Sequence, residues 1–215
     1  MRKITKRAGY EPEELTDWKR SNPNKRYPQL KDGAVRQAIR NEALAEQYYL
    51  CGHCCQALSG DGDCHNEHVE AQDLNQNRTL DFSNIIASCN TLKQCGDSHK
   101  SQPMPLTPLM AQCETDLVFK LSGRVSGKTP DAIETIRVLN LGDTEKNNKS
   151  LIEKRKQLSL ALLTEHAIAP EDEEDWAEEP ELLADLINDL LTPDHGKLKP
   201  FAPVVVNVLR QWIAQ

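Results

Sequence analysis

The sequence lacks any long apolar run. Its 215 residues contain no stretch near the ~20 consecutive apolar residues that a bilayer-spanning helix needs. The first residues, from Met1 to Arg7, lack the apolar segment of a signal peptide, and the chain has no internal repeats and no long low-complexity tract. We therefore expect a cytoplasmic protein without membrane association, built as one domain with extensions or as two small domains.

The chain also lacks a net positive charge. Its formal charge of −7 would by itself argue against a nucleic-acid partner. The distribution is uneven, however, because residues 1–50 carry eleven Lys and Arg against seven Asp and Glu, whereas residues 151–215 carry six against thirteen. The basic N-terminal segment is therefore either an ordinary solvated surface or a contact surface for nucleic acid.

What the sequence does contain is a dense group of cysteines and histidines. Six of the seven cysteines and four of the six histidines fall within residues 51–100. In a reducing compartment, clustered cysteines favour a metal over disulfides. A C-x2-C pair followed by a looser C-x5-C pair can supply the four thiolates of a tetrahedral zinc site. The structural zinc ligands that this spacing selects are Cys51, Cys54, Cys89 and Cys95, with Cys55 and Cys64 as substitutes.

Between the two cysteine pairs lies Glu67-His68, a combination suited to phosphodiester hydrolysis. Glu67 can hold a hard divalent cation such as Mg²⁺ or Mn²⁺, and His68 can take a proton from the attacking water. Asn84 can orient the imidazole through its side-chain carbonyl, and His99 can complete the cation site from a short helix. A Glu-His pair alone is usually a surface accident, but its position between two halves of a zinc site favours a catalytic role.

These motifs resemble an HNH endonuclease of the ββα-metal type with zinc-ribbon cysteines. The residues that carry the resemblance are Cys51-x2-Cys54, Glu67-His68-Val69, Asn84-x4-Cys89 and Cys95-Gly-x2-His99-Lys100. A wider frame is similar to the PtuB-type HNH nucleases of Septu and retron-associated antiphage systems. That frame comprises Met1-Arg-Lys-Ile-Thr-Lys6, Gln47-x2-Leu50-Cys51, Leu80-Asp-Phe-Ser-Asn-Ile-Ile-Ala-Ser-Cys89, Cys95-Gly96 and Ile136-x2-Leu139-Asn-Leu141, within residues 1–160.

The resemblance implies an α+β fold with a ββα-metal HNH core and a zinc knuckle, flanked by helices. It implies a metal-dependent endonuclease subunit that cuts DNA, with RNA left open, beside an ABC-like ATPase subunit. The resemblance also allows a further partner, a retron reverse transcriptase with its msDNA. The competing hypothesis is a non-catalytic zinc module that binds protein or nucleic acid. Only the nuclease predicts a second cation site at Glu67.

Carried over to this chain, the family pattern makes His68 the general base, Glu67 a ligand of the catalytic cation and Asn84 the middle Asn. His99 takes the third position. Two departures affect that position: the chain has Gly96 where many HNH motifs have Asn or His, and the spacing between the last two cysteines is wider than usual. The substitutes for the third position are Asp97 and His65.

The chain is expected to divide around this core. The predicted regions are an N-terminal arm and helix (1–50), the nuclease core with its zinc site (51–108), a helical support region (109–168), and an acidic linker with C-terminal helices (169–215). Helical spacing predicts helices at 33–49, 130–139, 150–168, 181–191 and 203–214. In the first of these, Arg36 and Arg40 are expected to face solvent. A short strand pair is expected at 116–121.

The last two predicted helices each carry an apolar stripe. The stripes comprise Leu182, Leu183, Leu186, Ile187, Leu190 and Leu191, and then Val204, Val205, Val208, Leu209 and Trp212. We expect both stripes to pack on the chain's own core. The alternative is a docking surface for the ATPase partner, in which the acidic linker Glu171–Glu179 faces basic residues of that partner.

Overall fold

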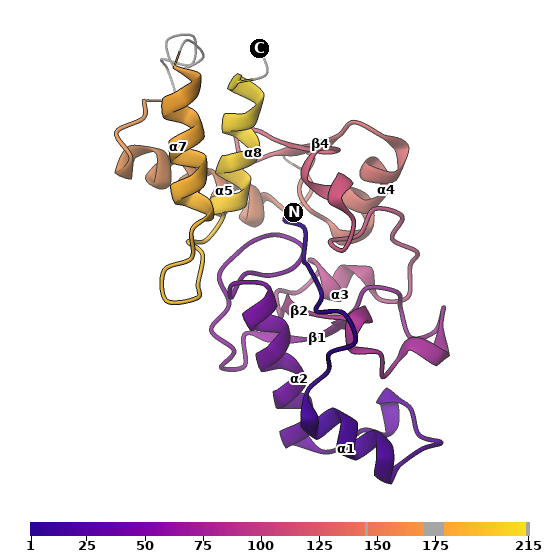
Figure 1. The fold of residues 1–215 in the computed structure, drawn as a ribbon. Helices are drawn as coiled ribbons and strands as arrows, with labels where there is room; N and C mark the ends of the chain where they lie inside the picture. Colours follow the sequence, from indigo (N-terminus) through magenta and orange to yellow (C-terminus); the bar gives the residue numbers. More distant parts are fainter. Residues whose placement is uncertain (145, 170–178, 214–215) are drawn as a thin grey trace.

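The computed structural model describes residues 1–144, 146–169 and 179–213, and it has mixed α+β architecture, as expected (Figure 1). The helices are α1 (Glu13–Ser21), α2 (Gly33–Glu46), α3 (Gly96–His99), α4 (Pro130–Leu139), α5 (Lys149–Glu165), α7 (Pro180–Leu191) and α8 (Ala202–Ile213). The strands are β1 (Cys64–His68), β2 (Ile85–Cys89), β3 (Leu117–Phe119) and β4 (Val125–Gly127). Within the described residues, no helix has the length and apolar character needed to cross a membrane.

The pair β1–β2 lies at the centre of the cysteine-rich region. The two strands are antiparallel, with Cys64 opposite Cys89 and His68 opposite Ile85. Every residue of β2 is buried. Side chains alternate between the faces of a strand, so β1 directs Glu67 to one face and His68 to the other. Helix α2 packs on this sheet, and the four-residue helix α3 follows β2 after a short loop (Figure 1).

Helix α2 begins at residue 33, as its apolar spacing predicts, and ends earlier than that spacing predicts. The Asp32 side chain accepts hydrogen bonds from two N–H groups of the first turn, which satisfies donors that the helix itself leaves free. The prediction of a helix over 33–49 is wrong at its C-terminal end. Tyr48 and Tyr49 adopt φ values of 52° and 60°, and this left-handed turn stops the helix at Glu46 and directs the chain toward the first cysteines.

A buried lysine fixes the N-terminal segment onto this core. The Nζ atom of Lys6 lies 2.6 Å from Glu46 Oε2 and donates to the Ile85 carbonyl at 2.9 Å. The same ammonium group stands 3.6 Å from the centre of the Phe82 ring. Burial lowers the pKa of Lys6, against the opposing effect of Glu46. The N-terminal segment is thereby joined to both α2 and β2.

Helix α1 packs on α2, whereas α4, α5, α7 and α8 form a second packed region with β3–β4. Helix α4 begins at Pro130 behind Thr129, whose side chain accepts from Ala132 N as a helix cap, in agreement with the sequence prediction. Asn207 of α8 accepts from Phe119 N at 2.9 Å and donates to two backbone carbonyls before and within β3. These bonds fasten α8 to the short sheet.

The two C-terminal stripes pack against the chain itself, which confirms the first of the two expectations for them. Helices α7 and α8 lie side by side (Figure 1), and their buried apolar residues belong to the continuous core that also contains β2. Leu182 is the exception, with half of its side chain exposed. Of the acidic linker Glu171–Glu179, all but the last residue lie outside the described residues.

Candidate functional site

The structure brings together the four cysteines that the sequence spacing selects. Cys51 and Cys54 come from the turn after α2, Cys89 ends β2, and Cys95 precedes α3. All four are buried, and their Sγ atoms lie within 4.8 Å of one another. A tetrahedral zinc ion with Zn–S bonds of about 2.3 Å places its sulfurs about 3.8 Å apart. The four sulfurs are therefore close to the arrangement that an ion requires, and they could hold a metal ion such as zinc.

Hydrogen-bond donors surround these sulfurs in a way that suits thiolates. Gln94 Nε2 points at Cys54 Sγ and Cys89 Sγ, each at 3.6 Å, and Cys89 N donates to Cys51 Sγ at 3.4 Å. Asn148, the residue that caps α5, orients the Gln94 amide, because its Nδ2 donates to Gln94 Oε1 at 2.9 Å. Hydrogen bonds from the other three thiols lower the pKa of Cys89. Sequence patterns contain no signal for Gln94 or Asn148, because both lie in turns far apart in the chain.

The two substitute cysteines lie outside this group. Burial raises the pKa of Cys64 to about 12, and Cys55 adopts a φ of 66° while its carbonyl accepts from Phe201 N. In the described part of the chain, no second set of three His, Cys, Asp or Glu side chains converges in the manner of the four cysteines. A second ion would therefore need ligands from water or substrate.

Glu67 lies between two histidines. Its Oε1 accepts from His99 Nδ1 at 2.7 Å, and its Oε2 accepts from His65 Nε2 at 3.1 Å. Burial would raise the pKa of Glu67, but these two hydrogen bonds and the nearby imidazoles lower it to about 2. Glu67 is consequently a carboxylate at neutral pH. Asp97, one of the substitutes for the third position, is instead directed away, since it accepts from Lys93 N at 2.6 Å.

The two histidines at Glu67 differ in what their second ring nitrogen contacts. His65 Nδ1 faces the Asn90 side-chain oxygen at 2.8 Å, and Asn90 is fixed in that orientation because its Nδ2 donates to the Gly62 carbonyl. Both ring nitrogens of His65 thus donate, and hydrogen bonds raise its pKa in spite of burial. His99 is fully buried, and its Nε2 has no partner. A cation held by Glu67 and either histidine would replace the one N–H that this imidazole directs at the carboxylate.

Gly96 stands against the Glu67 carboxylate. A Cβ atom at this position would lie 2.6 Å from Glu67 Oε2 and 2.5 Å from His65 Nε2, and contacts this short force the side chains apart. The sequence marks Gly96 as a departure from the usual HNH pattern. The structure supplies a physical reason for it: the first residue of α3 passes directly over the carboxylate, and any side chain there would push the Glu67 and His65 side chains out of place.

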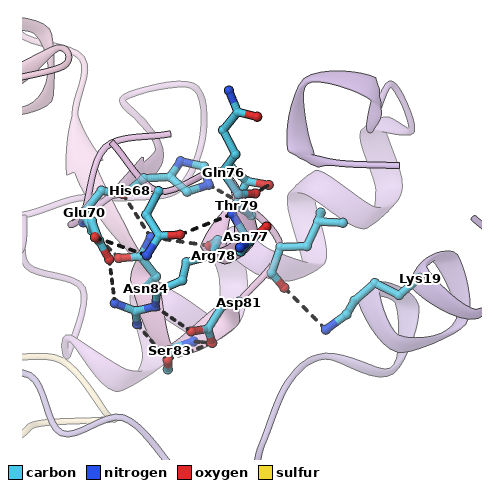
Figure 2. Close-up of polar contacts among 12 residues, drawn as sticks. Lys19, His68, Glu70, Gln76, Asn77, Arg78, Thr79, Asp81, Ser83 and Asn84 are labelled. Carbon is cyan, nitrogen blue, oxygen red and sulfur yellow. Dashed lines mark hydrogen bonds and ion pairs between the residues drawn. The ribbon is translucent and has the colours of Figure 1, made fainter. Parts of the chain in front are cut away.

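His68 is a buried imidazole with one nitrogen free to accept a proton. Its Nε2 donates to the Thr79 carbonyl at 2.9 Å (Figure 2), which leaves Nδ1 as the acceptor, 3.3 Å from Gln72 Nε2. The Tyr27 ring packs edge-on against it, with the ring centres 4.7 Å apart. Burial lowers the pKa of His68, so the ring is neutral at physiological pH.

Asn84 does not orient this imidazole, and the expectation that its side-chain carbonyl would do so is wrong. Its Oδ1 accepts from Glu70 N at 2.8 Å, and its Nδ2 donates to the Glu70 and Arg78 carbonyls at 3.0 and 3.4 Å (Figure 2). The acceptor that holds His68 is the backbone carbonyl of Thr79. Asn84 supports this contact indirectly, because its hydrogen bonds to Glu70 and Arg78 hold the loop that contains Thr79.

Arg78 closes the same loop from its outer side. It donates to Glu70 Oε2 at 3.0 Å, to Asp81 Oδ2 at 3.1 Å and to Ser83 Oγ at 3.3 Å (Figure 2). From its sequence, the segment 71–80 resembles an ordinary polar loop. The structure shows that its side chains fix the one carbonyl that determines which nitrogen of His68 carries the proton.

Glu67 and His68 open onto one polar hollow of about 420 Å³. Residues from β1, from the following loop and from the end of α3 line it: His65, Asn66, Glu67, His68, Ala71, Gln72, Asp73, Lys100 and Ser101. His53, between Cys51 and Cys54, lies outside it and is fully buried. Burial lowers the pKa of His53 to about 4.

A comparison of the chain with protein-family models finds no match, and a comparison with curated proteins finds none. The arrangement of side chains around Glu67 and His68 is therefore the basis for assigning a function.

Proposed function

We propose that this chain is a metal-dependent nuclease of the HNH type that hydrolyses phosphodiester bonds in DNA, with RNA as the other substrate to test. One observation carries the proposal: an anionic carboxylate and a neutral imidazole with an unprotonated Nδ1 occupy consecutive positions of β1 and line the same hollow. A general base beside a cation-binding carboxylate is the minimum that phosphodiester hydrolysis by this route requires.

In this proposal His68 is the general base. Its Nδ1 takes a proton from the attacking water. The Thr79 carbonyl accepts a hydrogen bond from Nε2–H, which keeps the ring proton on Nε2 and leaves Nδ1 unprotonated. Gln72, whose amide lies next to Nδ1, must move aside or share the water. A low pKa keeps the imidazole neutral before the reaction, which a base requires.

Glu67 and His99 are the residues that would hold Mg²⁺ or Mn²⁺. Such an ion, when bound, supplies positive charge that stabilises the oxygen leaving phosphorus. Two protein ligands are enough for Mg²⁺, because it keeps several waters and takes further oxygens from the substrate phosphate. Binding would release the proton that His99 Nδ1 and Glu67 Oε1 share.

The four cysteines have a structural part in the proposal. A zinc ion on Cys51, Cys54, Cys89 and Cys95 would join the turn after α2 to the end of β2 and the start of α3. These three elements place His99 against Glu67. We therefore infer that β1, β2 and α3 form the ββα-metal core, with the zinc as its cross-link.

The motif resemblance extends the proposal to the protein's setting. We infer an effector of an antiphage system in the cytoplasm, working beside an ABC-like ATPase subunit and, in a retron setting, a reverse transcriptase with its msDNA. The apolar stripes of α7 and α8 are buried in the chain's own core. An ATPase partner would therefore have to bind another surface.

A second cation site separates the nuclease from a non-catalytic zinc module. We expect the zinc-loaded chain to bind one further Mn²⁺, measured by electron paramagnetic resonance, and Glu67→Gln to abolish that binding. Gly96→Ala should weaken it by about 10- to 100-fold, because the added methyl displaces the carboxylate without removing it.

The matched control is Gly33→Ala, since Gly33 also opens a helix and an added Cβ there meets nothing within 4 Å. It should leave Mn²⁺ binding unchanged. Absence of a second Mn²⁺ site in zinc-loaded wild-type protein, or binding that survives Glu67→Gln, would favour the non-catalytic zinc module.

A further inference from the structure

Two arginines of α2, behind the Asn66 wall of the hollow, have no counter-charge among the described residues. Arg36 and Arg40 are one helical turn apart, and both are half-buried instead of projecting into solvent as the sequence predicts. Among the described residues neither forms an ion pair, and the Nε atom of each is buried with no hydrogen-bond partner. The one hydrogen bond from either guanidinium is that of Arg40 Nη1 to Gln37 Oε1 at 2.7 Å.

This arrangement is unfavourable unless an anion completes it. Like charges four residues apart on a helix repel each other, and half-buried cations lose hydration that no protein partner replaces here. Carboxylates are not scarce, since the chain has 33 Asp and Glu against 26 Lys and Arg. Asp63, which together with Arg40 influences the Cys64 thiol, is already occupied by the N–H groups of Ser59 and Gly60.

The arginine pair is connected to the general base through one tyrosine. The Arg36 guanidinium carbon lies 5.2 Å from the centre of the Tyr27 ring, and the same ring packs 4.7 Å from the His68 ring. Burial raises the pKa of Tyr27, and both arginines act against that rise, which places both near its hydroxyl. The Arg36 guanidinium and the His68 imidazole thus lie against the same tyrosine ring.

Asn66 fixes the pair to the wall of the hollow. Its Nδ2 donates to the Tyr27 hydroxyl at 3.0 Å and to the Arg36 carbonyl at 2.9 Å, and Asn66 itself lines the hollow. On the other face of β1, the exposed Lys100 lines the hollow next to α3. Cationic groups therefore stand on both sides of the strand that carries Glu67 and His68.

We propose that Arg36 and Arg40 form a phosphate-binding subsite for the nucleic-acid strand that enters the hollow, an inference that rests on the proposed nuclease function. The planar guanidinium groups suit phosphate oxygens, which they can bind in pairs. Contacts to phosphates position the strand without reading its sequence. Arg36 and Arg40 are accordingly positioning residues for the scissile bond.

Salt dependence of binding tests this subsite. The full zinc-loaded chain, with His68→Ala to prevent cleavage, is titrated into a fluorescent single-stranded oligonucleotide at several salt concentrations. In the double variant Arg36→Gln/Arg40→Gln, the slope of log K against log salt should become shallower by about 1.4, that is, by about 0.7 for each phosphate of a single strand that the variant no longer binds. The reduction should be the same for different sequences and for DNA and RNA. Arg36→Lys with Arg40→Lys should keep the slope, because the charges remain.

Arg2→Gln is the matched control. Arg2 is also half-buried and also stacks on a tyrosine, with its guanidinium carbon 4.4 Å from the Tyr48 ring centre, but it packs at the opposite end of α2. The slope of log K against log salt for Arg2→Gln should equal that of the parent chain. Zinc content and melting temperature are measured for every variant, so that unfolding is not mistaken for weaker phosphate binding.

Three results would overturn the subsite: an unchanged slope in the double Gln variant, an equal reduction in Arg2→Gln, or a reduction confined to one sequence. Failure of the proposed function has a different signature. In that case the parent chain binds nucleic acid with the expected slopes, and the wild-type chain with intact His68 still does not cleave it.

Discussion

Replacement of His68 by alanine is expected to lower the rate of phosphodiester hydrolysis by about 10²- to 10⁴-fold, the usual contribution of a general base. His68 Nδ1 is the free acceptor on the hollow, because its Nε2 is held by the Thr79 carbonyl. Glu67 cannot substitute, since both of its oxygens are engaged by histidines. Cleavage of a labelled oligonucleotide under single-turnover conditions measures the decrease.

The same variant should also be less stable. We expect its melting temperature to fall, because His68 is only 5 % exposed. Its removal leaves the Thr79 carbonyl without its partner, at a cost of about 1–3 kcal/mol. The assay therefore has to run well below the lowered melting temperature. His166→Ala, at the end of α5, is the control that should keep the rate. A His68→Ala chain that cuts at the wild-type rate removes His68 from the mechanism.

Replacement of Cys51 by serine is expected to abolish tight zinc binding and to unfold the region between α2 and α4. Structural zinc in small domains contributes about 10–16 kcal/mol of apparent binding energy, which is as large as the whole net stability of about 5–15 kcal/mol of most native proteins. The secondary structure of this region contributes little stability of its own to replace the lost zinc. Strands β1 and β2 have five residues each and α3 has four, and a helix this short does not form alone.

Elemental analysis and circular dichroism test the second prediction together. We expect one zinc per wild-type chain and less than one, with a lower melting temperature, in Cys51→Ser. Cys113→Ser is the matched control, because Cys113 is equally buried but lies outside the four-sulfur group, and it should retain the zinc. Well-folded wild-type protein that contains no zinc would contradict the structural role of the four cysteines.

Some of this site follows from local sequence patterns and some does not. The C-x2-C spacing identifies Cys51 and Cys54, and adjacency along β1 identifies Glu67 and His68, because these signals depend on a few neighbouring residues. The four sulfurs converge as the spacing suggests. The helix at Pro130 is likewise predictable, since its threonine cap and its proline are both read directly from the chain.

The remainder depends on backbone positions that no pattern encodes. Which carbonyl receives the His68 proton is decided by the path of an irregular loop, so the sequence pattern assigns to Asn84 the contact that the Thr79 backbone makes. The end of α2 depends on two left-handed tyrosines, residues for which that conformation is uncommon. The requirement for glycine at position 96 appears only when α3 is placed against Glu67.

Cation-dependent cleavage is the most direct measurement of the central claim. The zinc-loaded chain, purified together with its genomic neighbours, is incubated with plasmid DNA and separately with RNA, in Mg²⁺, in Mn²⁺ and in EDTA. We expect strand cleavage with either cation, none in EDTA, and none with Glu67→Gln or His68→Ala when these proteins retain their zinc. Cleavage that persists in both variants, or no cleavage of either substrate with either cation, would contradict a nuclease centred on Glu67 and His68.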